Sequence, residues 1–242
     1  GIITLSTDCS MVGCLMSSQL KENELYPIVE RWMRRHFQCF KTIIDKGLKY
    51  GRIDVLGVRD VGGDLSGEIE TIAIEVKKGI TPFAKASGQT LGYRVYANRV
   101  YLADLRQSSF TSDEIHIASN LGIGLIQIKG KICREILSSP HYNPITKLNL
   151  MLLESVAIGK CQLCNSFFEI GDYKNNRFSK LARENLKHAI SRQKGMMFWN
   201  YEASYRKNKF NERRAKKGTA YDRRYICPEC IEVLFSSMLD DK

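Results

Sequence analysis

The alternating segment Ile72–Lys77 places the strongest constraint on the fold of this chain. Its apolar residues alternate with Ala73, Glu75 and Lys77. Because side chains two residues apart lie on the same face of a β-strand, Glu75 and Lys77 are expected to share one face while the isoleucines enter the core. The segment therefore predicts a β-strand that carries an acid and an amine side by side.

A second strand is expected immediately upstream. Residues 51–58 open on a glycine, continue in apolar, β-favouring residues and include Asp54, and a glycine-rich turn signal follows at residues 60–64. Strand, turn and strand would place Asp54 and Glu75 on adjacent strands. Two carboxylates can hold Mg²⁺ through hard oxygen ligands, and a neighbouring lysine can orient or activate an attacking water. The alternative interpretation is a solvated strand face that carries ordinary charges.

Two predicted helices flank these strands. Residues 23–38 carry an apolar stripe at helical spacing, and Glu24 falls at the edge of that stripe, from which it could reach a site beside the sheet. The alternative role for Glu24 is that of an acid favoured at a helix start by the macrodipole. Downstream, Gln89 and Tyr93 are four residues apart on the second helix and are therefore neighbours on one face.

Together these elements resemble the PD-(D/E)XK nuclease superfamily, including members with a Gln-x3-Tyr element such as RecB-type nucleases. The resemblance covers roughly residues 20–135, and position 53 is isoleucine where the superfamily's name has proline. It implies an α-β-β-β-α-β core. It also implies that Glu24 assists through water and that Gln89 and Tyr93 touch the substrate backbone or the active-site lysine.

The same resemblance implies a catalytic metal centre. The Asp54 and Glu75 carboxylates and the Val76 carbonyl would hold Mg²⁺ or Mn²⁺, and Lys77 would serve the nucleophile. The implied reaction is hydrolysis of a phosphodiester bond in DNA. An endonuclease in restriction, defence or repair is the favoured interpretation, and exonuclease action is the alternative. A homodimer is expected where both strands are cut.

The positive charge of the chain is concentrated in one segment. Residues 174–224 contain 16 Lys or Arg against 4 Asp or Glu, an excess of 12, whereas the whole chain has a net charge of +11. Such asymmetry is the electrostatic footprint of a polyanionic partner, and the alternative is a solvated helix face. The residues expected to contact nucleic acid are Arg52, Arg206, Lys207, Lys209, Arg213, Arg214, Lys216 and Lys217.

Two cysteine pairs bracket that basic segment. Cys161-x2-Cys164 and Cys227-x2-Cys230 have the internal spacing of knuckles that bind tetrahedral Zn²⁺, with four sulfurs at one centre. A zinc with four thiolate ligands has no open position, so its role would be structural. Disulfides or unrelated thiols are the alternatives. The 62 residues between the pairs exceed a simple ribbon, and an inserted folded element is expected there.

These observations predict an α/β protein of two parts. The first is a restriction-endonuclease-like core at residues 20–157, a central mixed sheet flanked by helices, after a lead-in at residues 1–19. The second is a smaller, mostly helical zinc module at residues 158–242 that contains the basic insertion. No run approaches the roughly 20 apolar residues of a membrane span, and the chain starts without a basic leader, so a cytoplasmic protein is expected.

Two other functions fit the same sequence. One is a nucleic-acid-binding protein whose nuclease-like fold has no catalytic activity. The other is a nuclease that cuts RNA, because no motif in the chain distinguishes a 2′-hydroxyl.

Overall fold

The computed structural model describes residues 21–48, 51–61, 68–161 and 164–169 and the single positions 227, 230 and 233. The chain divides into two compact units. The first contains residues up to Arg59 together with Glu70–Asn143, and the second contains Asp60–Ile69 together with the residues from Pro144 onward. The predicted lead-in, the basic insertion and seven of the expected nucleic-acid contacts lie outside the described residues, namely Arg206, Lys207, Lys209, Arg213, Arg214, Lys216 and Lys217.

The centre of the first unit is a six-stranded mixed sheet in the order β1-β2-β3-β4-β5-β6. β1 is antiparallel to β2. β3, β4 and β5 run parallel to one another, and β6 is antiparallel to β5. The bounds are β1 (Lys41–Leu48), β2 (Gly51–Asp60), β3 (Ile69–Lys77), β4 (Arg99–Leu105), β5 (Gly124–Lys129) and β6 (Ile132–Leu137).

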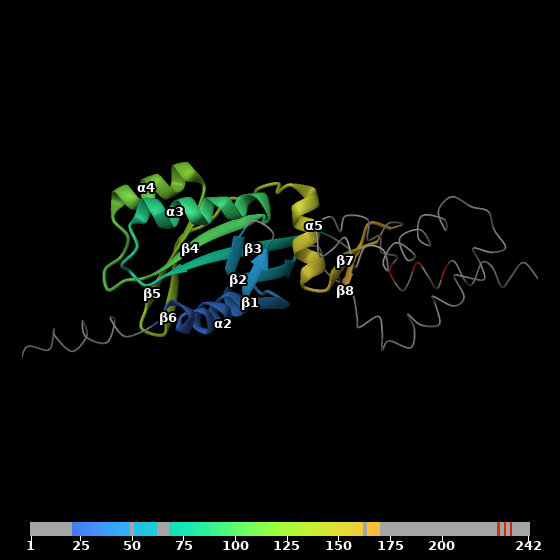
Figure 1. Cartoon of the computed structure of the whole chain (residues 1–242), viewed down its shortest axis with the longest axis horizontal. Helices are drawn as coiled ribbons and strands as arrows, with labels where there is room; N and C mark the ends of the chain where they lie inside the picture. Colours follow the sequence, from blue (N-terminus) through green and yellow to red (C-terminus); the bar gives the residue numbers. More distant parts are fainter. Residues whose placement is uncertain are drawn as a thin grey trace, which may run out of the picture. The chain divides into compact units, whose positions relative to one another are not determined.

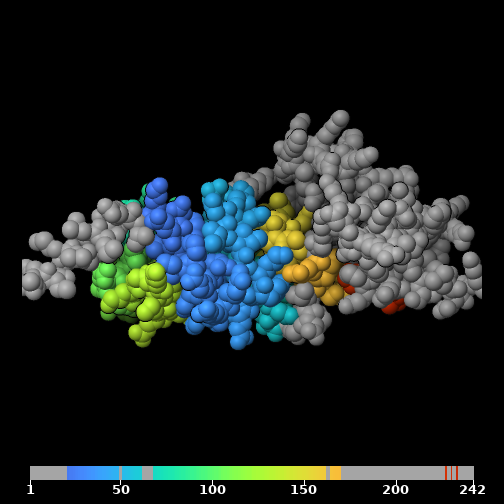
Figure 2. All heavy atoms as spheres, turned by 90° about the horizontal axis from the view of Figure 1, so that it is seen from below, coloured from blue at the N-terminus to red at the C-terminus, as the bar shows by residue number. Residues whose placement is uncertain are grey.

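Helices cover both faces of this sheet (Figure 1). The 3₁₀ turn η1 (Glu22–Glu24) leads into α2 (Tyr26–His36), which lies on one face. On the other face lie α3 (Phe83–Gly92), which continues into the 3₁₀ turn η2 (Tyr93–Val95), and α4 (Ser112–Leu121). A central mixed sheet flanked by helices is thus confirmed. Viewed from the α2 side, residues of α2 and β1 form much of the surface of this unit (Figure 2).

The hydrophobic core explains why these segments fold as they do. Val29 and Met33 on α2 are fully buried and pack in one cluster with Ile74 and Val76 of β3. The predicted alternation along β3 is therefore confirmed, because its isoleucines and valine face α2 while Glu75 and Lys77 point to the opposite side. Every residue of β3 is buried, as expected for a strand covered on both faces.

The second unit contains the helix α5 (Thr146–Ser155) and a two-stranded antiparallel sheet of β7 (Ile158–Lys160) and β8 (Phe167–Glu169). Cys161 follows β7 directly, and Cys164 lies in the connection to β8. The two compact units meet in the sequence at Asn143 and Pro144, whereas the sequence predicts a boundary near residue 158. In the part of the chain that the structure describes, no helix has the length and hydropathy needed to cross a membrane.

Candidate active site and metal centre

A pocket of about 450 Å³ opens in the first unit at the ends of β2 and β3. It brings together six of the residues that the sequence singled out. β2 and β3 supply Asp54, Glu75 and Lys77, η1 supplies Glu22, and α3 and η2 supply Gln89, Gly92 and Tyr93. The lining residues are Glu22, Leu48, Gly51, Arg52, Asp54, Glu75, Lys77, Gln89, Gly92, Tyr93 and Tyr96.

The Asp54 carboxylate is buried and held by two hydrogen bonds. The Tyr26 hydroxyl donates to Oδ1 at 2.9 Å, and the Val76 backbone N–H donates to Oδ2 at 2.8 Å. Burial, together with the negative charge of Glu75, raises the pKa of Asp54 to about 6, although the two hydrogen bonds act in the opposite direction. The Asp54 and Glu75 carboxylates therefore lie close enough for their negative charges to repel each other.

The Glu75 carboxylate is also contacted on both oxygens. The Lys77 ammonium lies 2.6 Å from Oε1, and the Tyr93 hydroxyl contacts Oε2. The same hydroxyl lies 2.5 Å from the Arg52 carbonyl oxygen, so its single proton faces two acceptors. Burial and the charge of Glu75 raise the pKa of Tyr93, which keeps the phenol protonated. In the structure Tyr93 thus contacts the acid, whereas the resemblance implied contact with the substrate or the lysine.

Lys77 is buried between two acids. Its Nζ lies 3.3 Å from Glu22 Oε1 in addition to its contact with Glu75. Burial alone would lower the pKa of Lys77, but the hydrogen bond and charge of Glu75 and the charges of Glu22 and Asp54 outweigh it, so the pKa is raised. At neutral pH the side chain is an ammonium ion. It can therefore donate hydrogen bonds and supply positive charge.

Glu24 does not lie in the pocket. Its Oε2 accepts a hydrogen bond from the Lys21 N–H at 2.8 Å, and this closes the 3₁₀ turn η1. The sequence pattern predicts a helix from residue 23, but α2 begins at Tyr26. The residues before it form a 3₁₀ turn, which has three residues per turn, so the side chains of this segment point in other directions than an α-helix would give them. Glu22 is consequently the acid of this segment that lines the pocket. Pro27, typical of a helix's first turn, was the signal that could have placed the helix start correctly.

Gln89 and Arg52 form more exposed parts of the wall. Gln89 projects from α3, and Arg52 pairs with Asp45 of β1 at 3.0 Å between Nη1 and Oδ1. Both side chains are solvent-accessible and so available to a bound molecule. Tyr26 is a residue that sequence reasoning missed, because nothing in the local pattern links a helix start to an acid 28 positions later.

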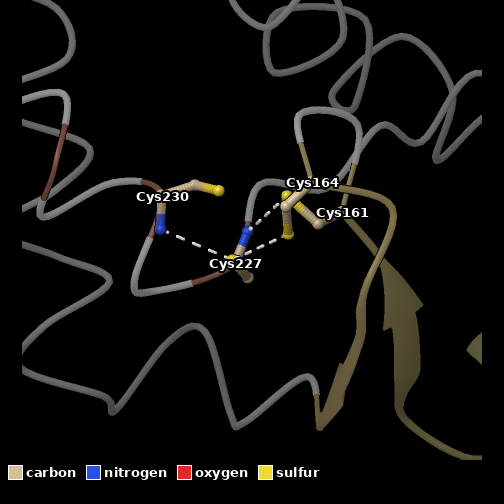
Figure 3. A group of neighbouring side chains, drawn as sticks. All are labelled: Cys161, Cys164, Cys227 and Cys230. Atoms are coloured by element: carbon tan, nitrogen blue, oxygen red, sulfur yellow. Dashed lines mark hydrogen bonds between the residues drawn. The ribbon is translucent and has the colours of Figure 1, made fainter. Parts of the chain in front are cut away.

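The four cysteines of the predicted zinc site form one cluster in the second unit (Figure 3). The sulfurs of Cys161, Cys164, Cys227 and Cys230 all lie within 4.8 Å of one another. The Cys164 and Cys227 sulfurs are 3.7 Å apart, close to the separation of about 3.8 Å that a tetrahedral ion with 2.3 Å metal–sulfur bonds requires.

Backbone amides support the same cluster. The Cys227 N–H points to the Cys161 sulfur at 3.4 Å, and the Cys230 N–H points to the Cys227 sulfur at 3.5 Å. None of the four thiols is in a disulfide. The group can therefore hold a metal ion such as zinc, and with four sulfur ligands such an ion would have a structural role.

Comparison with known proteins adds little to this geometry. No family model matches the chain, and no curated protein matches its sequence. The chain is similar to a solved protein of unknown function from Silicibacter pomeroyi, with a TM-score of 0.42 and 20% sequence identity over 57% of this chain and 86% of the other.

Proposed function

We propose that this protein is a divalent-metal-dependent nuclease that hydrolyses phosphodiester bonds in DNA. The observation that carries the proposal is the convergence of Asp54, Glu75 and Lys77 in one pocket. The order of elements gives additional support. α2, β1, β2, β3, α3 and β4 follow one another as the α-β-β-β-α-β core of the PD-(D/E)XK superfamily would, with the acids on β2 and β3 and Gln89 on α3.

The donor atoms fit Mg²⁺ or Mn²⁺. Each carboxylate offers about four lone-pair positions, and the protein's own groups contact each of the four oxygens of Asp54 and Glu75 once. Lone pairs on hard oxygen therefore remain for a cation. The raised pKa of Asp54 indicates that its charge is incompletely compensated within the pocket, which a divalent ion would correct. When bound, the ion would stabilise negative charge on the scissile phosphate and lower the pKa of a water.

The chain's own residues supply the remaining requirements. The Lys77 ammonium holds the attacking water or a phosphate oxygen in line by hydrogen bonding and charge. Glu22 helps to keep that ammonium in place. Arg52 and Gln89, on the exposed wall of the pocket, would contact the nucleic-acid backbone. The basic residues 174–224 are proposed to bind the nucleic acid beside the cut.

Cleavage of a panel of nucleic acids tests this proposal. Supercoiled circular DNA, linear duplex DNA, branched DNA and RNA are incubated with the full chain in Mg²⁺, in Mn²⁺ and in EDTA. We expect DNA cleavage with either ion and none in EDTA, and cutting of the circle identifies an endonuclease. No cleavage of any substrate contradicts the proposal, and cleavage of RNA alone supports the RNA nuclease instead.

Binding of DNA is expected to depend strongly on salt. If the basic segment neutralises about six phosphates, affinity should fall about 10³-fold between 50 and 200 mM salt, measured by fluorescence anisotropy in EDTA. Removing four of those charges should flatten the slope of log K against log[salt], by up to about 0.9 for each phosphate that is no longer neutralised. The variant replaces Arg213, Arg214, Lys216 and Lys217 with alanine.

A matched control removes exposed charge elsewhere. Lys129, Lys131 and Arg134 lie at and beside the β5–β6 turn, and their replacement by alanine should leave the salt slope unchanged. An equal change in both variants would mean that the net charge, and not the basic segment, attracts the DNA. Strong, salt-sensitive binding without any cleavage would favour the non-catalytic binding protein.

A further inference from the structure

We propose that Tyr26 is a positioning residue that fixes the Asp54 carboxylate for metal binding. This inference depends on the proposed nuclease function, because it assigns a role within the same pocket. Tyr26 is the first residue of α2, and its hydroxyl donates to Asp54 Oδ1 at 2.9 Å. Both side chains are largely buried, with 9% of Tyr26 and 7% of Asp54 exposed.

The position of the phenol is set by the core of the protein. Leu25, which precedes α2, and Val29 and Met33 within α2 are at most 1% exposed. They pack in one cluster with residues of the sheet. The start of α2 is therefore held firmly, and the hydroxyl of Tyr26 is held with it. A hydroxyl placed by a rigid helix gives a more exact orientation than one placed by a loop.

The phenol and a backbone amide together define the orientation of the acid. Tyr26 holds Oδ1, and the Val76 N–H of β3 holds Oδ2, so two elements that are far apart in sequence fix the plane of one carboxylate. A tyrosine hydroxyl is protonated at neutral pH, and it therefore donates this hydrogen bond to the carboxylate. Groups that orient a metal ligand in this way commonly change metal affinity by about 10- to 100-fold.

The second acid of the pocket has an equivalent partner. The Tyr93 hydroxyl contacts Glu75 Oε2 from η2, which follows α3. Tyr26 of α2 thus contacts Asp54 and Tyr93 of η2 contacts Glu75, so each acid of the pocket has its own phenol. Tyr93 belongs to the Gln-x3-Tyr element of the sequence, whereas Tyr26 belongs to none of the motifs described above.

The experiment measures metal affinity directly. Tyr26→Phe and wild-type protein, freed of Mg²⁺ and Mn²⁺ by gel filtration and keeping their cysteine-bound zinc, are titrated with Mn²⁺ in the absence of DNA. Bound Mn²⁺ is followed by electron paramagnetic resonance. We expect affinity to fall about 10- to 100-fold in the variant. In cleavage assays the concentration of Mn²⁺ needed for half-maximal rate should rise similarly, while the rate at saturating Mn²⁺ should change much less.

A matched control separates positioning from general stability. Tyr101 is also a buried tyrosine whose hydroxyl donates to a carboxylate, Glu135 Oε1 at 3.0 Å, but it does not line the pocket. Tyr101→Phe should leave Mn²⁺ affinity within about twofold of wild type. Wild-type affinity in Tyr26→Phe, or an equal loss in both variants, overturns the inference. If the wild type itself binds no Mn²⁺ at this site, the proposed function fails instead.

Discussion

Replacement of Asp54 by asparagine is expected to reduce DNA hydrolysis by about 10³-fold or more. The substitution keeps the shape of the side chain and its hydrogen bonds, because Oδ1 can accept from the Val76 N–H while Nδ2 donates to the Tyr26 hydroxyl. It removes the negative charge that would attract Mg²⁺. Loss of several kcal/mol of charge stabilisation corresponds to a rate change of this size. Initial rates on plasmid DNA at saturating Mg²⁺ measure it.

The same substitution is expected to stabilise the protein at pH 8 in buffer that contains no Mg²⁺ or Mn²⁺. Burial and the charge of Glu75 raise the pKa of Asp54 from 3.8 to about 6 in the folded state. The folded protein then binds this proton more tightly than the unfolded chain, so the group's contribution to stability falls as pH rises from about 4 through 6. Asparagine does not ionise, so the variant does not lose stability in this way as pH rises. A shift of about two units corresponds to at most about 3 kcal/mol.

Urea unfolding of both proteins at pH 4.5, 6 and 8 isolates this effect as a difference. The advantage of Asp54→Asn over wild type should grow between pH 4.5 and about 6 and then level off. A hydrolysis rate equal to that of wild type would exclude Asp54 as a metal ligand. A variant that is less stable than wild type at pH 8 would mean that the hydrogen bonds and the Lys77 charge stabilise the Asp54 carboxylate more than burial and Glu75 destabilise it.

Replacement of Cys227 by serine is expected to abolish zinc binding and to unfold the part of the second unit around the cysteines. Binding of a structural zinc contributes on the order of 10–16 kcal/mol in small zinc-dependent modules, which is at least comparable to the roughly 5–15 kcal/mol stability of a typical domain. The zinc content of purified protein, measured by atomic absorption, should fall from about one ion per chain to almost none. Trypsin should then cleave the C-terminal part rapidly.

Cys133 provides the control for this experiment. It is buried in the first unit and is not part of the cluster. Burial raises the pKa of its thiol to about 11, so it is a poor metal ligand at neutral pH. Cys133→Ala should keep the wild-type zinc content. Wild-type protein without zinc, or Cys227→Ser with a full complement, would contradict the structural role assigned to the cluster.

The parts of the site that follow from local periodicity could be predicted from the sequence. A strand period of two puts Glu75 and Lys77 on one face whatever surrounds them. Only eight residues separate β2 from β3 in the sequence, and the two strands are neighbours in the sheet. The cysteine cluster was also predictable, since four thiolates at knuckle spacing have few other uses. In both cases the chemistry of the residues restricts the three-dimensional solutions to very few.

Two kinds of feature could not be predicted. One depends on the exact residue at which a helix begins, and the other depends on contacts between segments that are far apart in the sequence. An α-helix that starts at residue 23 favours Glu24, whereas a 3₁₀ turn before Tyr26 brings Glu22 to Lys77. The bond from Tyr26 to Asp54 joins two elements whose relative placement is decided by the packing of the whole core. No local pattern contains that information.

The cysteine cluster has a consequence for how the chain can vary. Its two pairs stand at the two ends of a 62-residue stretch, so the beginning and end of that stretch are tied to a single point. Because the entropy of closing a loop rises only with the logarithm of its length, doubling the stretch would cost only about 0.6 kcal/mol. Segments of different length and charge could therefore be exchanged at this junction while the pocket in the first unit keeps its architecture.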